Sequence, residues 1–130
     1  MVLVDDVVPA DEISALRDPV ESRRRRAELG LRGTPWHGDV FVVLSILRDH
    51  HPELAMRVIV DSGNDQALLW RPDDTPTEPV SASTLAGYRD LTYADVFAEG
   101  VPDWCRPGAE QQVLTEALTC SNARRAAVKP

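Results

Sequence analysis

The chain has 130 residues, which is enough for one domain with its own core and too few for two. Its 43% hydrophobic and 27% charged residues are typical of a folded globular protein, and they argue against disorder, collagen-like repeats and a disulfide scaffold. The 14 Lys and Arg against 21 Asp and Glu give a net charge of −7. This charge disfavours general nucleic-acid binding, because contacts to phosphate need a positive surface.

The charge is distributed unevenly along the chain. Residues 1–22 contain six acidic residues and one Arg, and residues 72–103 contain seven acidic residues and one Arg. Residues 23–32 contain five Arg and one Glu. The sequence therefore predicts two acidic surfaces and a short basic block.

No apolar run in the sequence is long enough to cross a membrane, the longest being Val40–Leu44. The first residues carry Asp5 and Asp6 where a signal peptide would carry basic residues. We therefore expect a cytoplasmic protein that does not associate with membranes. In that compartment Cys105 and Cys120 would be reduced thiols.

The N-terminal third predicts a short strand or ordered arm at 2–8, followed by a helix at 19–29. Asp18 is suited to cap that helix, Pro19 to occupy its first position, and Gly30 to end it.

The most apolar segment, 39–51, has two interpretations. Val40, Val43, Leu44 and Leu47 have the spacing of one helical face, whereas the β-branched residues in the segment favour a strand. We favour the helix, which would end before Pro52.

Two β-rich runs at 56–61 and 66–71 are joined by Ser, Gly, Asn and Asp, which predicts a hairpin. Because two strands alone are only marginally stable, the hairpin needs a further strand or a helix layer, which 2–8 and 39–51 could supply.

The C-terminal half begins with an acidic, proline-rich loop at 72–83. A weak helix follows within 85–99, capped by Thr92 and Asp95. A second proline-rich loop at 101–108 then leads into an amphipathic helix at 109–120. Together these elements predict one α+β domain at 1–121, in which a small antiparallel sheet packs against two to four helices. A flexible C-terminal tail is expected at 122–130.

Catalytic chemistry has weak candidates in this sequence. His37 and Asp39 could act as general acid and base beside Trp36, although Asp39 is more simply explained as a helix cap and His37 as a loop residue. A thiol nucleophile at Cys105 would need its pKa lowered by Arg106, and the sequence places no His beside it.

The sequence predicts no metal and no cofactor. A helix at 39–50 would hold His37 and His50 about 20 Å apart, and no Cys or His spacing typical of zinc sites occurs. The glycine-rich signatures of nucleotide binding and the serine-hydrolase motif are also absent from the sequence.

The four consecutive arginines at 23–26 suggest a nucleic-acid patch, but on a helix they point around most of its circumference. Asp18, Glu21 and Glu28 lie within pairing distance along the same helix. We therefore expect a solvated helix whose arginines are neutralised by its own acidic residues. The second interpretation is that the arginines contact acidic residues elsewhere in the molecule or in a partner, and the third is that they bind nucleic acid.

Trp36-His37-Gly38 is similar to the W-x-G tripeptide of small helical-hairpin secretion substrates. The predicted hairpin at 56–71 has no place in such a two-helix rod, so we reject membership of that family.

The leading functional hypothesis is a non-catalytic binding or accessory protein, comparable to small acidic immunity proteins and assembly factors. Its acidic face would engage a basic protein partner, with aromatic side chains as anchors. Reversing the acidic residues of the 72–79 loop to Lys should weaken that binding. The expected partner-binding residues are Trp70, Asp73, Asp74, Glu78, Asp103 and Trp104.

The alternative function is a small pathway enzyme or ligand-binding protein that uses His37 and Asp39 near a pocket lined by Trp36. A homodimer is also compatible with the sequence.

Overall fold

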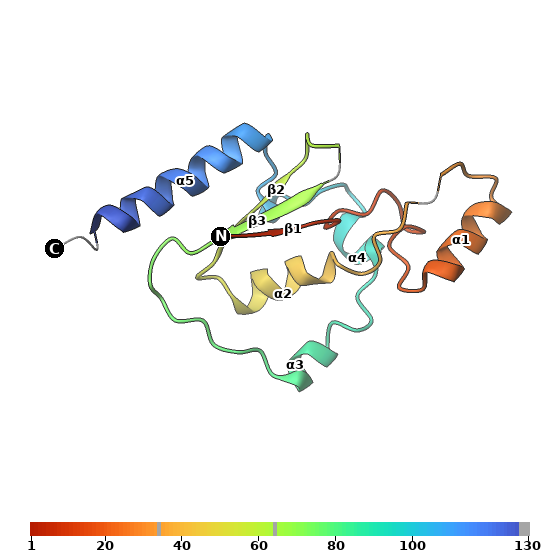
Figure 1. Cartoon of the computed structure of the whole chain (residues 1–130). Coiled ribbons are helices and arrows are strands. Elements are labelled where there is room, and N and C mark those ends of the chain that lie inside the picture. Colours follow the sequence, from red (N-terminus) through yellow and green to blue (C-terminus); the bar gives the residue numbers. More distant parts are fainter. Residues whose placement is uncertain (34, 64, 128–130) are drawn as a thin grey trace.

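A three-stranded antiparallel sheet forms the centre of the computed structural model, which describes residues 1–33, 35–63 and 65–127. The hairpin of β2 (Ala55–Ile59) and β3 (Gln66–Trp70) confirms the predicted pair of strands. Its predicted turn includes Asn64, which lies outside the described residues. The predicted N-terminal strand is β1 (Val2–Val4), which pairs with β3 and gives the order β1-β3-β2 (Figure 1). The α+β fold class is thus as predicted.

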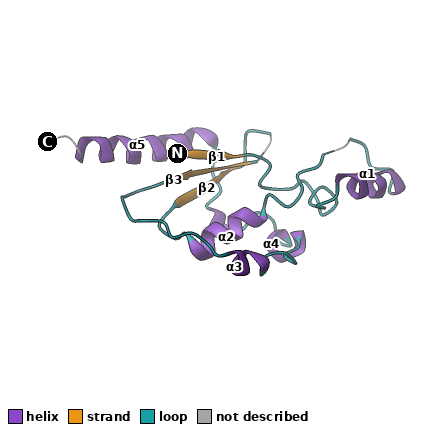
Figure 2. Ribbon diagram, turned by 60° about the horizontal axis from the view of Figure 1, so that its bottom comes forward, coloured by secondary structure: helices purple, strands orange, loops and turns teal. Residues whose placement is uncertain are grey.

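Alternating side chains give the sheet two apolar faces, each covered by helices. Met56 and Val58 of β2 face one core cluster together with Ala67 and Leu69 of β3. The intervening residues of the two strands face the other side, toward the C-terminal helix. Figure 2 shows this arrangement, with the sheet between the short helices of residues 42–97 and the long C-terminal helix.

The first face is covered chiefly by α2 (Val42–His50) and α4 (Tyr93–Phe97). The helical interpretation of the segment 39–51 is therefore confirmed, although the helix begins at Val42. Phe41 and Leu44 are almost fully buried, and the ring of Phe41 meets Phe97 edge-on at 5.8 Å between centroids. A short helix, α3 (Ala82–Ala86), precedes α4.

The second face is covered by α5 (Glu110–Ala127), whose Val113 and Ala117 are fully buried against the sheet. The predicted end of this helix at Cys120 is wrong, because the helix continues to Ala127 and extends past the sheet (Figure 1). The expected tail at 122–130 is therefore helical as far as residue 127, and residues 128–130 lie outside the described part. Whether this segment is flexible stays a prediction.

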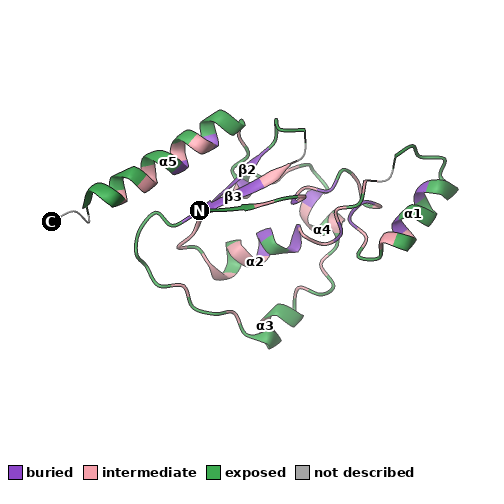
Figure 3. Ribbon diagram, in the orientation of Figure 1, coloured by how far each residue is buried: buried purple, intermediate pink, exposed green. Residues whose placement is uncertain are grey.

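The helix α1 (Pro19–Glu28) lies at one end of the molecule and is mostly exposed (Figure 3). Its predicted cap is confirmed, since the Asp18 side chain accepts a hydrogen bond from the backbone N–H of Val20 at 2.8 Å. Within the described residues, no helix combines the length and apolar character needed to cross a membrane.

Two of the four consecutive arginines of α1 follow the expected self-neutralised pattern, whereas Arg23 donates, among the described residues, only to the backbone carbonyl of Pro19, at 3.2 Å. Arg24 pairs with Glu21 and Glu28, and Arg25 pairs with Glu21. Arg26 is buried instead, and its guanidinium donates to both carboxylate oxygens of Asp11 at 2.9 and 2.7 Å. The prediction of a solvated side chain is therefore wrong for Arg26. Its carboxylate partner, Asp11, lies before α1 in the chain and not on the helix itself.

Candidate functional site

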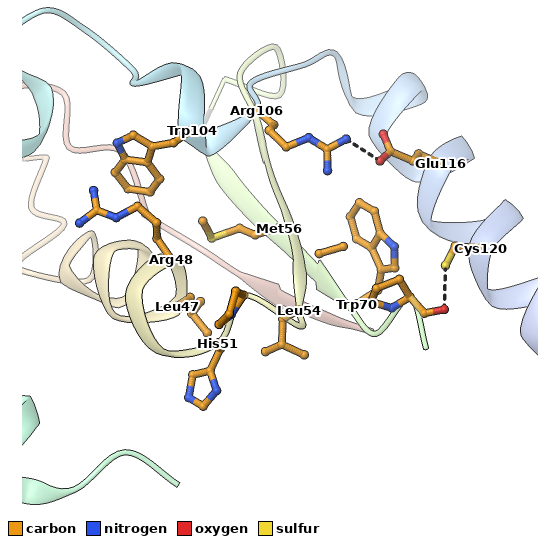
Figure 4. A pocket seen from close by; sticks show the side chains of 13 residues that line it. Leu47, Arg48, His51, Leu54, Met56, Trp70, Trp104, Arg106, Glu116 and Cys120 are labelled. Carbon is orange, nitrogen blue, oxygen red and sulfur yellow. Dashed lines mark hydrogen bonds and ion pairs between the residues drawn. The ribbon is translucent and has the colours of Figure 1, made fainter. Parts of the chain in front are cut away.

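A groove of about 510 Å³ lies between the end of α2, the two hairpin strands, the 3-10 helix η1 (Asp103–Cys105) and α5. We call it the tryptophan groove, because Trp70 and Trp104 lie on either side of it with Met56 between them (Figure 4). The two aromatic residues predicted as partner anchors therefore line the same groove. Other lining residues include Leu47, Arg48, Leu54, Arg106, Glu116 and Cys120.

The two tryptophans differ in exposure. Trp70 is only 4% exposed and packs against α5 through the second core cluster, so it forms part of the groove wall. Trp104 is partly buried, and the Arg48 guanidinium lies 4.6 Å from the centroid of its ring. This cation–π contact covers one face of the indole.

A hydrogen-bonded chain holds Arg48 against Trp104. The Arg48 guanidinium donates to both carboxylate oxygens of Asp49 at 2.6 and 3.0 Å, which lowers the pKa of Asp49. The Tyr88 hydroxyl donates to Asp49 at 2.8 Å and lies 2.9 Å from Nε2 of His50. The position of the Trp104 wall is thus tied to the end of α2 and to the segment that follows α3.

The part of the groove formed by Arg106 and Glu116 is held by Arg57, a buried arginine that the sequence patterns did not single out. From β2 its guanidinium donates to Glu116 on α5 at 2.5 Å and to the backbone carbonyls of Arg106 at 3.0 Å and Pro107 at 3.4 Å. The loop between η1 and α5, which contains these carbonyls, also forms a β-bridge to β2, in which the Gly108 N–H donates to the Val58 carbonyl at 2.9 Å. The connection between η1 and α5 is therefore fixed to the edge of the sheet.

A second hollow, of about 470 Å³, lies on α4 and the loop after it and shares Trp104 with the groove. We call it the acidic hollow, because Asp95, Glu99 and Asp103 line it. Asp95 completes the predicted cap of α4, where hydrogen bonds from Thr92 lower its pKa. In the part of the chain that the structure describes, no cation pairs with Glu99 or Asp103.

The acidic loop that was expected to bind a partner is partly neutralised internally. Asp74 pairs with Arg124 of α5, and Asp73 accepts a hydrogen bond from the backbone N–H of Thr75 at 2.8 Å. Glu78 is exposed, with no partner among the described residues. The loop meets the groove only through Pro72.

The proposed acid–base residues His37 and Asp39 have separate partners. Asp39 forms an ion pair with Arg17 at 2.7 Å and does not cap α2, which begins at Val42. The Nε2 atom of His37 lies 3.8 Å from a carboxylate oxygen of Asp6. Neither residue lines the tryptophan groove or the acidic hollow.

The residue Trp36 lies outside both hollows as well. Its indole N–H donates to the carbonyl of Leu16 at 2.7 Å, and the residue is 44% exposed.

The geometry contradicts a thiol nucleophile at Cys105. The residue is fully buried, and desolvation raises the pKa of its thiol to about 12, with Arg48 opposing this shift. The guanidinium of Arg106 points instead to Glu116, at 2.9 Å (Figure 4). Among the described residues, no group of three or more His, Cys, Asp or Glu could hold a metal ion.

Comparison with known proteins found no matching protein-family model, no matching curated protein and no matching solved structure.

Proposed function

We propose that this protein is a non-catalytic binding protein that receives a basic segment of a protein partner on the surface around Trp104. The observation that carries the proposal is that Trp104 is the common wall of an apolar groove and an acidic hollow. A partner that covers this indole can therefore bury apolar surface in the groove and form ion pairs with the carboxylates of the acidic hollow at the same time.

The charges of the acidic hollow favour a basic partner. Glu99 and Asp103 have no cation partner within the described residues, so a Lys or Arg from outside would not have to displace an internal ion pair. Complementary charge of this kind steers association and selects partners more than it adds affinity. The affinity would come from burial of the partly exposed Trp104, since large aromatic side chains are common anchors at interfaces.

This proposal moves the centre of the expected interface. The acidic loop at 72–79 meets the groove only through Pro72, and its Asp74 is already paired with Arg124. We place the binding in a reducing compartment such as the cytoplasm, in keeping with two free cysteines.

Selection of a random phage-displayed peptide library on the purified protein tests the proposal. We expect the selected peptides to be enriched in Lys and Arg relative to the starting library. Their affinity for the double variant Glu99→Lys/Asp103→Lys should fall at least about tenfold, and the salt dependence of binding should weaken.

The matched control is the double variant Glu12→Lys/Glu28→Lys, which makes the same charge change in a hollow beside α1, at one end of the molecule (Figure 1). We expect it to bind the peptides as the unmodified protein does. Selected peptides without an excess of basic residues, or an equal loss in both double variants, would overturn the proposal.

A further inference from the structure

We infer that the partner segment carries a bulky apolar side chain that enters the tryptophan groove, and a Lys or Arg two residues away that reaches the acidic hollow. This inference rests on the proposed function and specifies the kind of segment that the site recognises.

The surface of the groove is suited to an apolar side chain. Its walls are Trp70 and Trp104, and Leu47, Leu54 and Met56 contribute further apolar surface (Figure 4). The volume of about 510 Å³ lies within the range of sites that enclose a ligand group, and such sites are mostly apolar with a few polar atoms. An aromatic or large aliphatic side chain would bury its surface there.

The rim of the groove disfavours a cation inside it. The guanidinium groups of Arg48 and Arg106 both lie at the groove, and Arg48 already occupies one face of the Trp104 indole. A Lys or Arg entering the groove would find the one acidic side chain among the described residues that line it, Glu116, already paired with Arg57 and Arg106. A carboxylate would gain little there, because Arg48 and Arg106 are already paired with Asp49 and Glu116.

The basic group of the partner therefore belongs in the acidic hollow, which shares Trp104 with the groove and contains Glu99 and Asp103. In an extended segment, side chains two residues apart point the same way and are separated by about 7 Å. This spacing is close to the width of one indole ring. An apolar residue at position i could thus enter the groove while a basic residue at position i+2 reaches the acidic hollow across Trp104.

Three short peptides, acetylated and amidated at their ends, separate the contributions. They are Arg-Ser-Phe-Ser-Arg, the same peptide with Ser in place of Phe, and the same peptide with Glu in place of both Arg. The symmetric design covers both directions of the chain. We expect the first peptide to bind at least about fivefold more tightly than either of the others.

The indole N–H resonances of Trp70 and Trp104 in NMR spectra report on the groove. The first peptide should shift both signals and should slow alkylation of Cys120, which lines the groove. The variant Trp104→Ala should reduce its affinity to that of the Ser peptide, and Trp104→Phe should retain part of the difference. The matched control Trp36→Ala removes a partly exposed tryptophan outside the groove and should not change the affinity for the first peptide.

The outcomes distinguish this inference from the proposed function. If the Phe and Ser peptides bind equally and both depend on Glu99 and Asp103, the inference is wrong and the acidic site stands. If neither basic peptide binds, both proposals fail. If the Glu peptide binds most tightly, the groove selects an apolar group with anionic neighbours, and the charge assignment is overturned.

Discussion

Arg57 is the residue whose environment most constrains the site. Its side chain is 9% exposed, and it reaches one carboxylate and two backbone carbonyls on the segment that leads into α5. A buried guanidinium is tolerated only where its donors and its charge are satisfied. A small residue at position 108 is part of the same arrangement, because a Cβ there would lie 2.4 Å from an Arg57 nitrogen.

Removing the charge of Glu116 tests this arrangement. We expect Glu116→Gln to lower the free energy of unfolding by about 1–2 kcal/mol, because it leaves Arg57 without a counter-ion. The loss is below that typical of a fully buried pair, since Glu116 is 35% exposed. Urea denaturation measures the change.

The control for this prediction is Arg106→Gln, which removes the exposed partner of the same carboxylate. It should change the free energy of unfolding by less than about 0.5 kcal/mol. Equal changes in the free energy of unfolding for the two substitutions would show that the buried contact of Glu116 with Arg57 stabilises the fold no more than its exposed contact with Arg106.

At the scale of elements, α1 is joined to the molecule in an unusual way. Its buried residues are Ser22 and Arg26, while Val20 is 63% exposed. Helices are ordinarily held by an apolar stripe, whereas this one depends on the Arg26–Asp11 ion pair. Asp11 also accepts a hydrogen bond from the backbone N–H of Ser14 at 2.7 Å, so one carboxylate organises both the turn and the helix.

We expect Asp11→Asn to loosen α1 without unfolding the sheet. Amide hydrogen exchange in α1 should accelerate about tenfold or more, with little change in β2 and β3, since such a segment can open locally. Arg24→Gln, which removes exposed ion pairs on the same helix, is the control and should have little effect. An equal loss of protection in α1 and in the sheet would contradict local opening.

The elements themselves were largely predictable from the sequence. The hairpin, the cap of α1 and the cap of α4 depend on neighbouring residues, and local patterns identify them well. The extension of α5 to Ala127 was missed because Asn122 and Arg125 are exposed and Arg124 is only partly buried, so no apolar stripe marks that part of the helix.

The site was predictable only in part. Trp70 and Trp104 were singled out as aromatic anchors, but their meeting in one groove depends on the packing of segments far apart in the sequence. The burial of Arg57 could not be predicted from the sequence, because an arginine within a strand is ordinarily expected to be exposed. Its partners are 49 to 59 residues away in the chain.

At the scale of the whole molecule, acid should destabilise the fold in a defined range. Hydrogen bonds from Arg57 and Arg106 lower the pKa of Glu116 in spite of its partial desolvation. Burial alone would raise the pKa of Asp11, but the hydrogen bonds from Arg26 and Ser14 outweigh it and lower that pKa as well. A carboxylate with a lowered pKa stabilises the fold above its unfolded-state pKa, and this contribution is lost as the pH falls through the folded-state pKa.

We therefore expect the free energy of unfolding to decrease from about pH 5 downward. The double variant Asp11→Asn/Glu116→Gln should show a shallower decrease, so that its deficit relative to the unmodified protein shrinks as the pH falls through the lowered folded-state pKa values of the two carboxylates. Urea titrations at a series of pH values measure both curves. A constant difference between the two curves would show that these carboxylates do not carry the acid sensitivity.

The Arg57 arrangement has a thermodynamic consequence for binding. Because it ties η1 and the start of α5 to β2 from within, both walls of the groove are in place before a partner arrives. Little backbone order remains to be gained on association, so the entropic penalty falls mainly on the incoming segment. The heat-capacity change on binding should then reflect apolar surface at the tryptophans and not coupled folding of the receptor.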